Sequence, residues 1–444
     1  MIFEKLGVQV PKILLPAPGT DMQRWAVIAC DQYTSDREYW QRLGQQTKDV
    51  VSTLPLIFPE VYLEDADAET RITDINRTME KYLADGSLVE QPPGFVLVER
   101  KISEVKSRKG LMLALDLEKY DYNRGAQSLI RATEGTILDR LPPRIKVREN
   151  APIELPHIMV LIDDPQRTVI EPLFEEQLRT VYDFELLANG GHLKGYAVDQ
   201  PELIQNIAAA LEALADPVAF QAKYQVAGEV MLYAMGDGNH SFATAKAIWD
   251  KLKEEVADPA EMMEHPARYA LVELVNIHDP GLEFEAIHRV LFNVDVSDLR
   301  TRMEGIFAAR GMAMSFTPCA DLAEAEALVA KVAKEHAFPV VFAGQFAVCS
   351  VAGLEYTLVV ATLQDCLDTY LEETPAARID YIHGCQTVSE LGSQPRTAGF
   401  YLPAISKHDL FKTIIHDGAL PRKTFSLGEA DEKRFYLECR RIKS

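Results

Sequence analysis

Cysteine is scarce in this sequence, and its six copies are scattered along 444 residues without any Cys-x-x-Cys pair. This spacing argues against a disulfide framework and against a zinc ribbon. Long apolar runs are also missing, because the longest, such as residues 157–162, fall well short of the ~20 residues that cross a bilayer. Residues 1–5 lack the basic region and apolar core of a signal peptide. We therefore expect a cytoplasmic protein that has no membrane partner.

Positive charge is in deficit. The chain carries 46 Lys and Arg against 67 Asp and Glu, a formal net charge of -21, which repels a polyanion over most of the surface. Nucleic acid is therefore not an expected partner. No histidine spacing resembles that of a zinc helix, so we expect no zinc. Neither Gly-x-x-x-x-Gly-Lys-Ser/Thr nor a dinucleotide fingerprint occurs, so the general nucleotide-binding motifs do not apply.

The length and the order of the expected elements indicate an α+β protein. Single cores stop growing near ~250 to 300 residues, so the chain has room for two to three subdomains, with mixed sheets and flanking helices. We predict a main αβ unit over residues 1–294 and a second αβ unit over residues 295–444 that closes with a strand. The sequence does not decide whether the chain forms a homo-oligomer.

Apolar periodicity places the main elements. In the first unit it predicts a hairpin of strands at 94–101 and 111–117, a helix at 202–215, and strands at 229–235 and 268–277. In the second unit it predicts a helix at 321–337, followed by β runs at 340–343, 346–351 and 356–361.

The segment of greatest chemical interest is Gly236-Asp237-Gly238-Asn239-His240-Ser241, between the buried strand and a following helix. Glycines at 236 and 238 allow positive φ and let a substrate approach main-chain N–H groups at the helix start. Asp237 can bind a metal or a hydroxyl group, and Asn239 and Ser241 offer hydrogen bonds to a substrate. His240 can exchange a proton. The alternative is a tight turn in which Asp237 and Asn239 satisfy loop amides and Ser241 caps the helix.

This turn resembles the Asp-Gly-His-His-Arg signature of the bacterial and archaeal family designated domain of unknown function 1015. Three other regions are similar to motifs of that family. Residues 131–136 resemble its His-Glu-x-Thr stretch, residues 276–290 its Asp-x-Gly-Leu and His-Arg elements, and residues 420–425 its Met-Pro-x-Lys-Ser-Thr motif. The matches extend over nearly the whole chain.

The chain departs from the family pattern in three places. Asn239 replaces the first histidine, Ser241 replaces the arginine, and the aromatic-Pro-Lys ending after Thr424 is missing. The signature also resembles, more distantly, the turn of the ParB and sulfiredoxin-like group, which includes free-serine kinases. Sulfiredoxin chemistry needs a cysteine in the turn, and no cysteine lies between Cys30 and Cys319.

A second candidate set lies in a locally basic segment. Arginine forks neutralise phosphate oxygens, so we expect Arg131 and Arg140 to bind substrate together with Thr136, while Glu134 positions a nucleophile or a metal. The alternative is a surface ion pair of Arg131 and Glu134 without a function.

Further cations lie later in the chain. His288 and Arg289 are candidate substrate-binding residues, although a histidine on an apolar segment is also typical of a core. Arg422 and Lys423 are expected to close over an anion, or else to form a solvated β-turn. Asp31 is a weaker candidate for binding a metal or a hydroxyl group.

Two hypotheses follow from these residues. The first is an enzyme acting on a small phosphorylated or phosphorylatable metabolite by phosphoryl transfer or phosphate-ester hydrolysis. The resemblance suggests serine or phosphoserine as that metabolite. Magnesium and a nucleotide are its candidate cofactors, since magnesium needs only one or two carboxylates beside substrate oxygens. The second hypothesis is a non-enzymatic regulator of ParB type that binds a nucleotide or nucleic acid.

Overall fold

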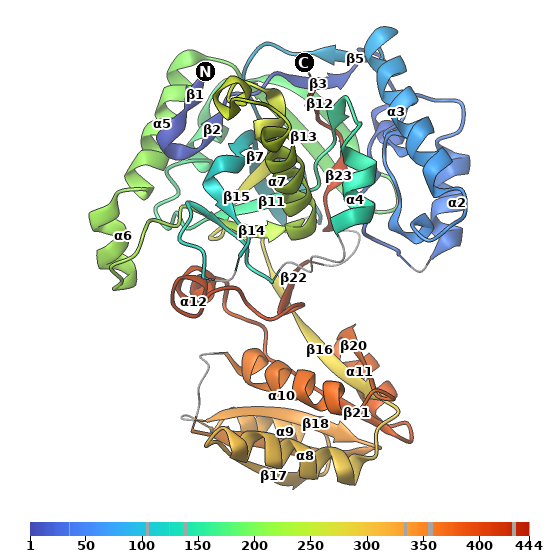
Figure 1. Cartoon of the computed structure of the whole chain (residues 1–444), viewed down its shortest axis with the longest axis vertical. Coiled ribbons are helices and arrows are strands. Elements are labelled where there is room, and N and C mark those ends of the chain that lie inside the picture. Colours follow the sequence, from blue (N-terminus) through green and yellow to red (C-terminus); the bar gives the residue numbers. More distant parts are fainter. Residues whose placement is uncertain are drawn as a thin grey trace. The chain divides into compact units, whose positions relative to one another are not determined.

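The computed structural model describes residues 1–34, 36–103, 106–123, 125–135, 141–332, 335–353, 358–428 and 432–443 (Figure 1). The chain has the expected α+β class and forms two compact units. Unit 1 comprises Met1–Glu283 and Leu427–Ser444, and unit 2 comprises Phe284–Ser426. These bounds differ from a division at residue 294. Strand β16 (Phe284–Phe292) belongs to the sheet of unit 2, whereas the last strands of the chain pair within unit 1.

A large mixed sheet forms the centre of unit 1, with eleven strands in the described part of the chain. In sheet order the strands are β12 (Arg179–Glu185), β13 (His192–Val198), β6 (Phe95–Lys101), β7 (Ser107–Asp116), β15 (Tyr269–Asn276), β11 (Met159–Ile162), β14 (Tyr233–Asp237), β9 (Ile130–Arg131) and β8 (Tyr120–Asp121), with β1 (Ile2–Phe3) and β2 (Val8–Gln9) beside β7. The β6–β7 pair is the hairpin that the sequence predicts. β15 also agrees with its predicted strand.

The register beside β14 decides which residues meet at its end. β11 runs antiparallel to β14, and Met159 lies opposite Asp237. The start of β11 and the end of β14 are therefore at the same edge of the sheet. Because of this register, the residues just before β11 lie next to the turn that follows β14.

Seven α-helices accompany this sheet in the described part of unit 1. They are α1 (Met22–Trp25), α2 (Arg37–Gln46), α3 (Ala68–Ala84), α4 (Leu141–Arg148), α5 (Pro201–Leu214), α6 (Pro217–Tyr224) and α7 (Asn239–Glu254). Helix α7 follows β14 directly (Figure 1) and buries Phe242, Ala245 and Trp249 in the main core. Among the described helices, none is long and apolar enough by itself to cross a membrane. Only the bent pair α5–α6, taken together, passes that test of length and composition.

The C-terminal strands pair with strands near the N-terminus. Strand β23 (Phe435–Tyr436) pairs with β4 (Val27–Ile28). Strand β24 (Cys439–Arg441) lies between β10 (Ile153–Glu154) and β3 (Ile13–Pro16), and β5 (Leu88–Glu90) completes that small sheet. These pairings place Tyr436 near the residues that follow β4.

Unit 2 is an antiparallel sheet with helices. Its strands are β17 (Ala313–Cys319), β19 (Gln345–Ala352), β18 (His336–Phe342), β21 (Thr397–Phe400), β16 and β20 (Arg378–His383) in sheet order, and β22 (Phe425–Leu427) lies at its boundary along the chain. Its helices are α8 (Val296–Ala309), α9 (Leu322–Val329), α10 (Val359–Glu373), α11 (Cys385–Gly392) and α12 (Leu410–Asp417).

Two predictions for unit 2 are wrong. The expected helix over 321–337 ends at Val329, and β18 begins at His336. The β run expected over 356–361 is in its described part the approach to α10, which begins at Val359. Helix α10 buries Val360, Leu363 and Leu367, a spacing of three and four residues, so the valines there belong to a helical face.

Candidate functional site

The turn between β14 and α7 has the glycine geometry that the sequence suggests, with a shift in its bounds. β14 ends at Asp237, two residues later than predicted, and α7 begins at Asn239. Gly238 occupies the N-cap position with φ of 76°. Ser241 is therefore in the first turn of α7 and is not its cap. A Cβ added at Gly238 would lie 3.1 Å from the Ile158 Cα, and one at Gly236 would lie 3.0 Å from the Leu161 Cγ.

Replacing Gly238 by alanine is expected to lower the free energy of unfolding by about 1 to 2 kcal/mol, the cost of a left-handed conformation for a residue with a Cβ. Gly44, inside α2, has nothing within 4 Å of its Cβ position, so Gly44→Ala is the matched control and should stabilise by roughly 0.5–1 kcal/mol. Urea denaturation measures both changes. Equal effects of the two variants would contradict a conformational requirement at Gly238.

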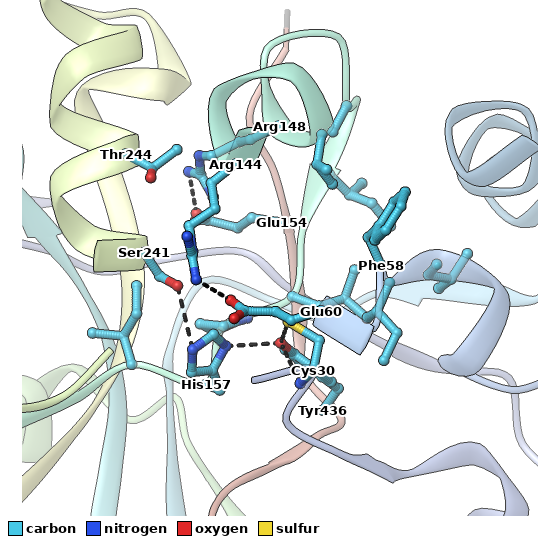
Figure 2. Close-up of a pocket in the computed structure, with 18 of the residues that line it drawn as sticks. Cys30, Phe58, Glu60, Arg144, Arg148, Glu154, His157, Ser241, Thr244 and Tyr436 are labelled. Carbon is cyan, nitrogen blue, oxygen red and sulfur yellow. Dashed lines mark hydrogen bonds and ion pairs between the residues drawn. The ribbon is translucent and has the colours of Figure 1, made fainter. Parts of the chain in front are cut away.

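A cavity of about 140 Å³ opens beside this turn. Ser241 and Thr244 of α7 line it, together with the residues before β11, helix α4, segment 56–63 and Tyr436 of β23. Figure 2 shows Ser241, His157, Arg144 and Glu60 pointing toward one another, and Phe58 on the side away from Ser241. The cavity therefore joins polar groups from these five parts of the chain to an apolar wall.

A hydrogen-bonded series of side chains forms the polar end of this cavity (Figure 2). Ser241 Oγ lies 3.3 Å from His157 Nε2, and His157 Nδ1 lies 2.8 Å from the Tyr436 hydroxyl. That hydroxyl donates to Cys30 Sγ at 3.0 Å and accepts the Cys30 N–H at 3.2 Å. Asp31 Oδ2 lies 3.5 Å from His157 Nε2. Burial, Asp31 and Glu60 raise the pKa of the Cys30 thiol, so Cys30 acts as a neutral hydrogen-bonding group.

Two ion pairs face the same cavity. Arg144 pairs with Glu60. Arg148 lies 2.5 Å from Glu154, which Arg440 also contacts at 2.6 Å. Burial raises the pKa of Glu60, and Asp31 adds to that rise, although Arg144 opposes it. For Glu154 burial also raises the pKa, but Arg440 and Arg148 outweigh it and the pKa is lowered. Of the two carboxyl groups, that of Glu60 therefore takes up a proton more readily than that of Glu154.

Asp237 forms an ion pair with Lys433, near the C-terminus of the chain. Its Oδ2 lies 3.2 Å from Lys433 Nζ, and its Oδ1 accepts the Gly238 N–H at 2.9 Å. Burial raises the pKa of Asp237, but Lys433 and His157 outweigh that effect, so the pKa is lowered. In the described part of the chain no three Asp, Glu, His or Cys residues gather around a metal position. Both carboxylate oxygens of Asp237 are engaged, so its described surroundings are those of an ion pair and not of a magnesium site.

Of the residues predicted from the basic segment, Glu134 lies near the turn. Asn239 Oδ1 accepts the Thr133 N–H at 3.3 Å, which brings the neighbouring Glu134 to this region. Arg131 is buried, and its guanidinium donates to the carbonyl groups of Ser128 and Glu229. The Arg131 contacts are those of a structural residue. Thr136 and Arg140 lie outside the described residues.

His240 has a different environment from the one expected. Its carbonyl accepts the Thr244 hydroxyl at 2.7 Å, and its side chain is not among those that line the cavity. The histidine that does line it is His157. The role predicted for His240 in proton exchange stays a prediction.

His288, Arg289, Arg422 and Lys423 belong to unit 2. His288 is buried, its Nδ1 accepts the Leu402 N–H at 3.1 Å, and burial, Arg289 and His383 lower its pKa to about 4. Arg289 is buried, and its Nε donates to the Gln364 side chain at 2.9 Å and its Nη2 to the Arg422 carbonyl at 3.1 Å. These are the contacts of core residues. Their predicted role in holding an anion stays a prediction.

Arg422 and Lys423 are more accessible. Arg422 donates to the Tyr381 hydroxyl at 2.6 Å and lies 3.2 Å from Asp368. Lys423 is exposed and has a positive φ of 56°. A turn at this position is therefore present, and the predicted clamp over an anion stays a prediction.

Sequence reasoning did not select several residues that the structure brings to the site, among them His157, Arg144, Tyr436 and Lys433. Arg144 lies in the locally basic segment of the sequence, whereas nothing local marks His157, which the register of β11 and β14 brings beside the turn. Tyr436 and Lys433 lie about two hundred residues from that turn along the chain, and strand pairing at the end of the chain brings them back.

Residues 14–370 match the family described as "Protein of unknown function (DUF1015)". The chain belongs to this family. The match covers most of the chain and includes the glycine turn, as the sequence motifs indicate. No curated protein matches the DUF1015 chain.

Several solved structures are similar to this DUF1015 protein at low identity. A conserved hypothetical protein from Pyrococcus furiosus is 13% identical with a TM-score of 0.37, over 75% of this chain and 95% of the other. A free serine kinase in complex with AMP is 11% identical with a TM-score of 0.38, over 75% and 91%. SbnI from Staphylococcus aureus is 10% identical with a TM-score of 0.36, over 71% and 82%. Likenesses at this level do not assign a function, and the resemblance to the ParB and sulfiredoxin-like group stays a prediction.

Proposed function

We propose that unit 1 is an enzyme that binds a small phosphorylated or phosphorylatable metabolite in the cavity beside the glycine turn and exchanges its phosphoryl group with a hydroxyl group. The observation that supports this most is the position of His157. Its Nε2 lies 3.3 Å from Ser241 Oγ, in the same 140 Å³ cavity that Arg144 and Arg148 line. A proton acceptor and two guanidinium groups thus face one small space.

The phosphate would bind between Arg144 and the start of α7. A helix start has N–H groups that lack an intrahelical acceptor, and its dipole favours negative charge. Ser241, in the first turn of α7, lines the cavity at this place. Arginine adds a planar pair of donors that suits phosphate oxygens. Arg144 must then exchange its Glu60 partner for the phosphate, and protonation of Glu60 makes that exchange easier.

His157 would move the proton. The Tyr436 hydroxyl donates to Cys30, so it would accept from Nδ1–H of a neutral His157, and Nε2 of that tautomer is unprotonated. Nε2 can then take the proton of a hydroxyl group as its oxygen bonds to phosphorus and the bond from phosphorus to the leaving oxygen breaks. The resulting imidazolium is stabilised by Asp31, 3.5 Å away. In the reverse direction His157 returns the proton.

Serine or phosphoserine as the metabolite, and a nucleotide as a second ligand, are the more specific parts of the proposal. A thermal-shift panel of phosphate, phosphoserine, serine and nucleotides, each with and without magnesium, tests them. We expect a rise in melting temperature with the phosphorylated members of the panel. No shift with any member would contradict the proposed function.

Anion binding should depend on pH through Glu60. An anion beside Glu60 raises its pKa further, so binding takes up a proton and affinity increases as pH falls, by up to about tenfold per pH unit. The probe is methyl sulfate, whose charge does not change with pH, and titration calorimetry at several pH values measures its affinity. Glu60→Gln should bind more tightly, with a flat profile. The exposed Glu64 gives the control variant Glu64→Gln, which should retain the wild-type profile. A flat wild-type profile would contradict displacement of Glu60.

A further inference from the structure

Most of the cavity wall is apolar, which phosphate and serine do not require. Segment 56–63 contributes Leu56, Phe58 and Leu63, helix α3 contributes Met79, and helix α4 contributes Val147. Phe58 lies on the side of the cavity away from Ser241, with Arg144 and Glu60 between them (Figure 2). The polar groups therefore gather at one end, and the rest of the space is lined by hydrocarbon.

The size of the cavity limits what it can enclose. An apolar cavity of about 150 Å³ holds a benzene ring, so a volume of about 140 Å³ suits an apolar body of about five or six carbon atoms. The phosphate group is placed at the polar end of the open cavity, beside Arg144 and Ser241. A whole nucleotide is much larger than this space, so a nucleotide that acts as the second ligand would reach it with a phosphate group alone.

We propose that the substrate of this site is a monoester or other anion attached to an apolar body of about five or six carbons, a phenyl or a pentyl group in size. Its anionic head contacts Arg144 beside Ser241 and His157. Its body lies against Phe58, Leu63, Met79 and Val147. This inference rests on the proposed function, and it makes an apolar ester, in place of the serine or phosphoserine named there, the ligand that is expected to bind more tightly.

The physical basis is the removal of hydrocarbon from water on both sides of the contact. Burial of one methylene contributes about 0.8 kcal/mol, which corresponds to an affinity about fourfold higher per carbon. Burial already raises the pKa of Glu60 in this cavity, as expected where hydrocarbon limits the access of water. A short-chain ester leaves the wall in contact with water and gains nothing from it.

Titration calorimetry on the full chain tests the inference with inorganic phosphate and with methyl, propyl, pentyl and phenyl phosphate. Affinity is expected to rise about fourfold per methylene from methyl to pentyl phosphate. The corresponding alkyl carboxylates form a second arm, and a parallel rise there supports the same apolar seat. If methyl and pentyl phosphate bind equally, the inference that the substrate carries an apolar body is wrong, and the proposed function stands. If no phosphate compound binds, the proposed function itself fails.

Variants test where the apolar body of the substrate binds. Val147→Phe fills the apolar end, so it should abolish the gain with chain length and leave the affinity for inorganic phosphate within about twofold. Leu63→Asn makes the same test without added volume. Ile145 is on the same helix and packs against the main core of unit 1, so Ile145→Phe is the control and should keep the gain. A gain that persists in both Val147→Phe and Leu63→Asn would overturn the placement of the apolar body.

Discussion

Replacing Arg434 by methionine is expected to lower the free energy of unfolding by about 3 to 5 kcal/mol. Arg434 Nη1 lies 2.5 Å from Glu273, and Nη2 pairs with Glu438. The exposed fractions of the three side chains are 6%, 1% and 0%. Methionine fills a similar volume but leaves two carboxylates buried without their main partner. Arg108, 3.7 Å from Glu273, compensates only one of them.

Arg441 provides the control on the same segment. It is half exposed and lies 3.9 Å from Glu90, and exposed pairs contribute only about 0–1 kcal/mol. Urea denaturation of Arg434→Met and Arg441→Met, compared with the wild type, measures both losses. A loss below about 1 kcal/mol for Arg434→Met would show that the buried charges are solvated or rearranged, contrary to the contacts described.

The same pairs set the pH range in which unit 1 is stable. For Glu273 burial raises the pKa, but Arg108 and Arg434 outweigh it and the pKa is lowered. A carboxyl whose folded pKa is depressed contributes stability above its unfolded value, and that stability is lost as pH falls through the folded pKa. Glu154 behaves in the same way. Glu273 binds Arg434 and Glu154 binds Arg440, both in the C-terminal segment, so acid should weaken the attachment of this segment.

The C-terminal segment also links stability to the site. Arg434 lies between Lys433, which pairs with Asp237, and Tyr436, which contacts His157. Loss of the Arg434 ion pairs should therefore displace both Lys433 and Tyr436. We expect ligand binding to weaken in Arg434→Met even at temperatures where the chain remains folded.

Local sequence patterns predict the fold well where an element is periodic and bounded. The β6–β7 hairpin, β15 and α5 follow from alternating or helical apolar spacing with clear ends. Helix α10 does not, because two valines at its start resemble a strand and its helical spacing becomes clear only later. The predicted boundary at residue 294 lies after the observed one, which follows Glu283. Nothing local in residues 284–292 reveals which sheet they join.

The site divides in the same way. The glycine turn is a local feature, and its position was predicted within two residues. The groups around it depend on pairing between distant segments. Antiparallel register places His157 beside Asp237, and β23 brings Tyr436 to Cys30 across about four hundred residues. Spacing along the chain carries no information about such partners, so the sequence points to His240 where the structure offers His157.

The two histidines are expected to respond differently to replacement by alanine. His157→Ala should reduce turnover by about 10²- to 10⁴-fold, the usual contribution of a positioned acid–base group, because no other imidazole lines the described cavity. Binding of the phosphate should change by less than about threefold, since Arg144 and the start of α7 remain. Three assays test the proposal. Two measure phosphate release, from p-nitrophenyl phosphate and from phosphoserine. The third measures nucleoside diphosphate release from a nucleoside triphosphate in the presence of serine.

His240→Ala is the matched variant, one residue before Ser241 on the same helix. Its side chain does not line the cavity, so its turnover should stay within about threefold of the wild type. The split between kcat and KM separates a chemical role from a structural one, because loss of a proton acceptor lowers kcat and leaves KM nearly unchanged. If His240→Ala loses turnover and His157→Ala does not, the residue suggested by the sequence is the acid–base group. If no assay detects turnover in the wild type, unit 1 binds its anion without transforming it, and the enzymatic proposal is wrong.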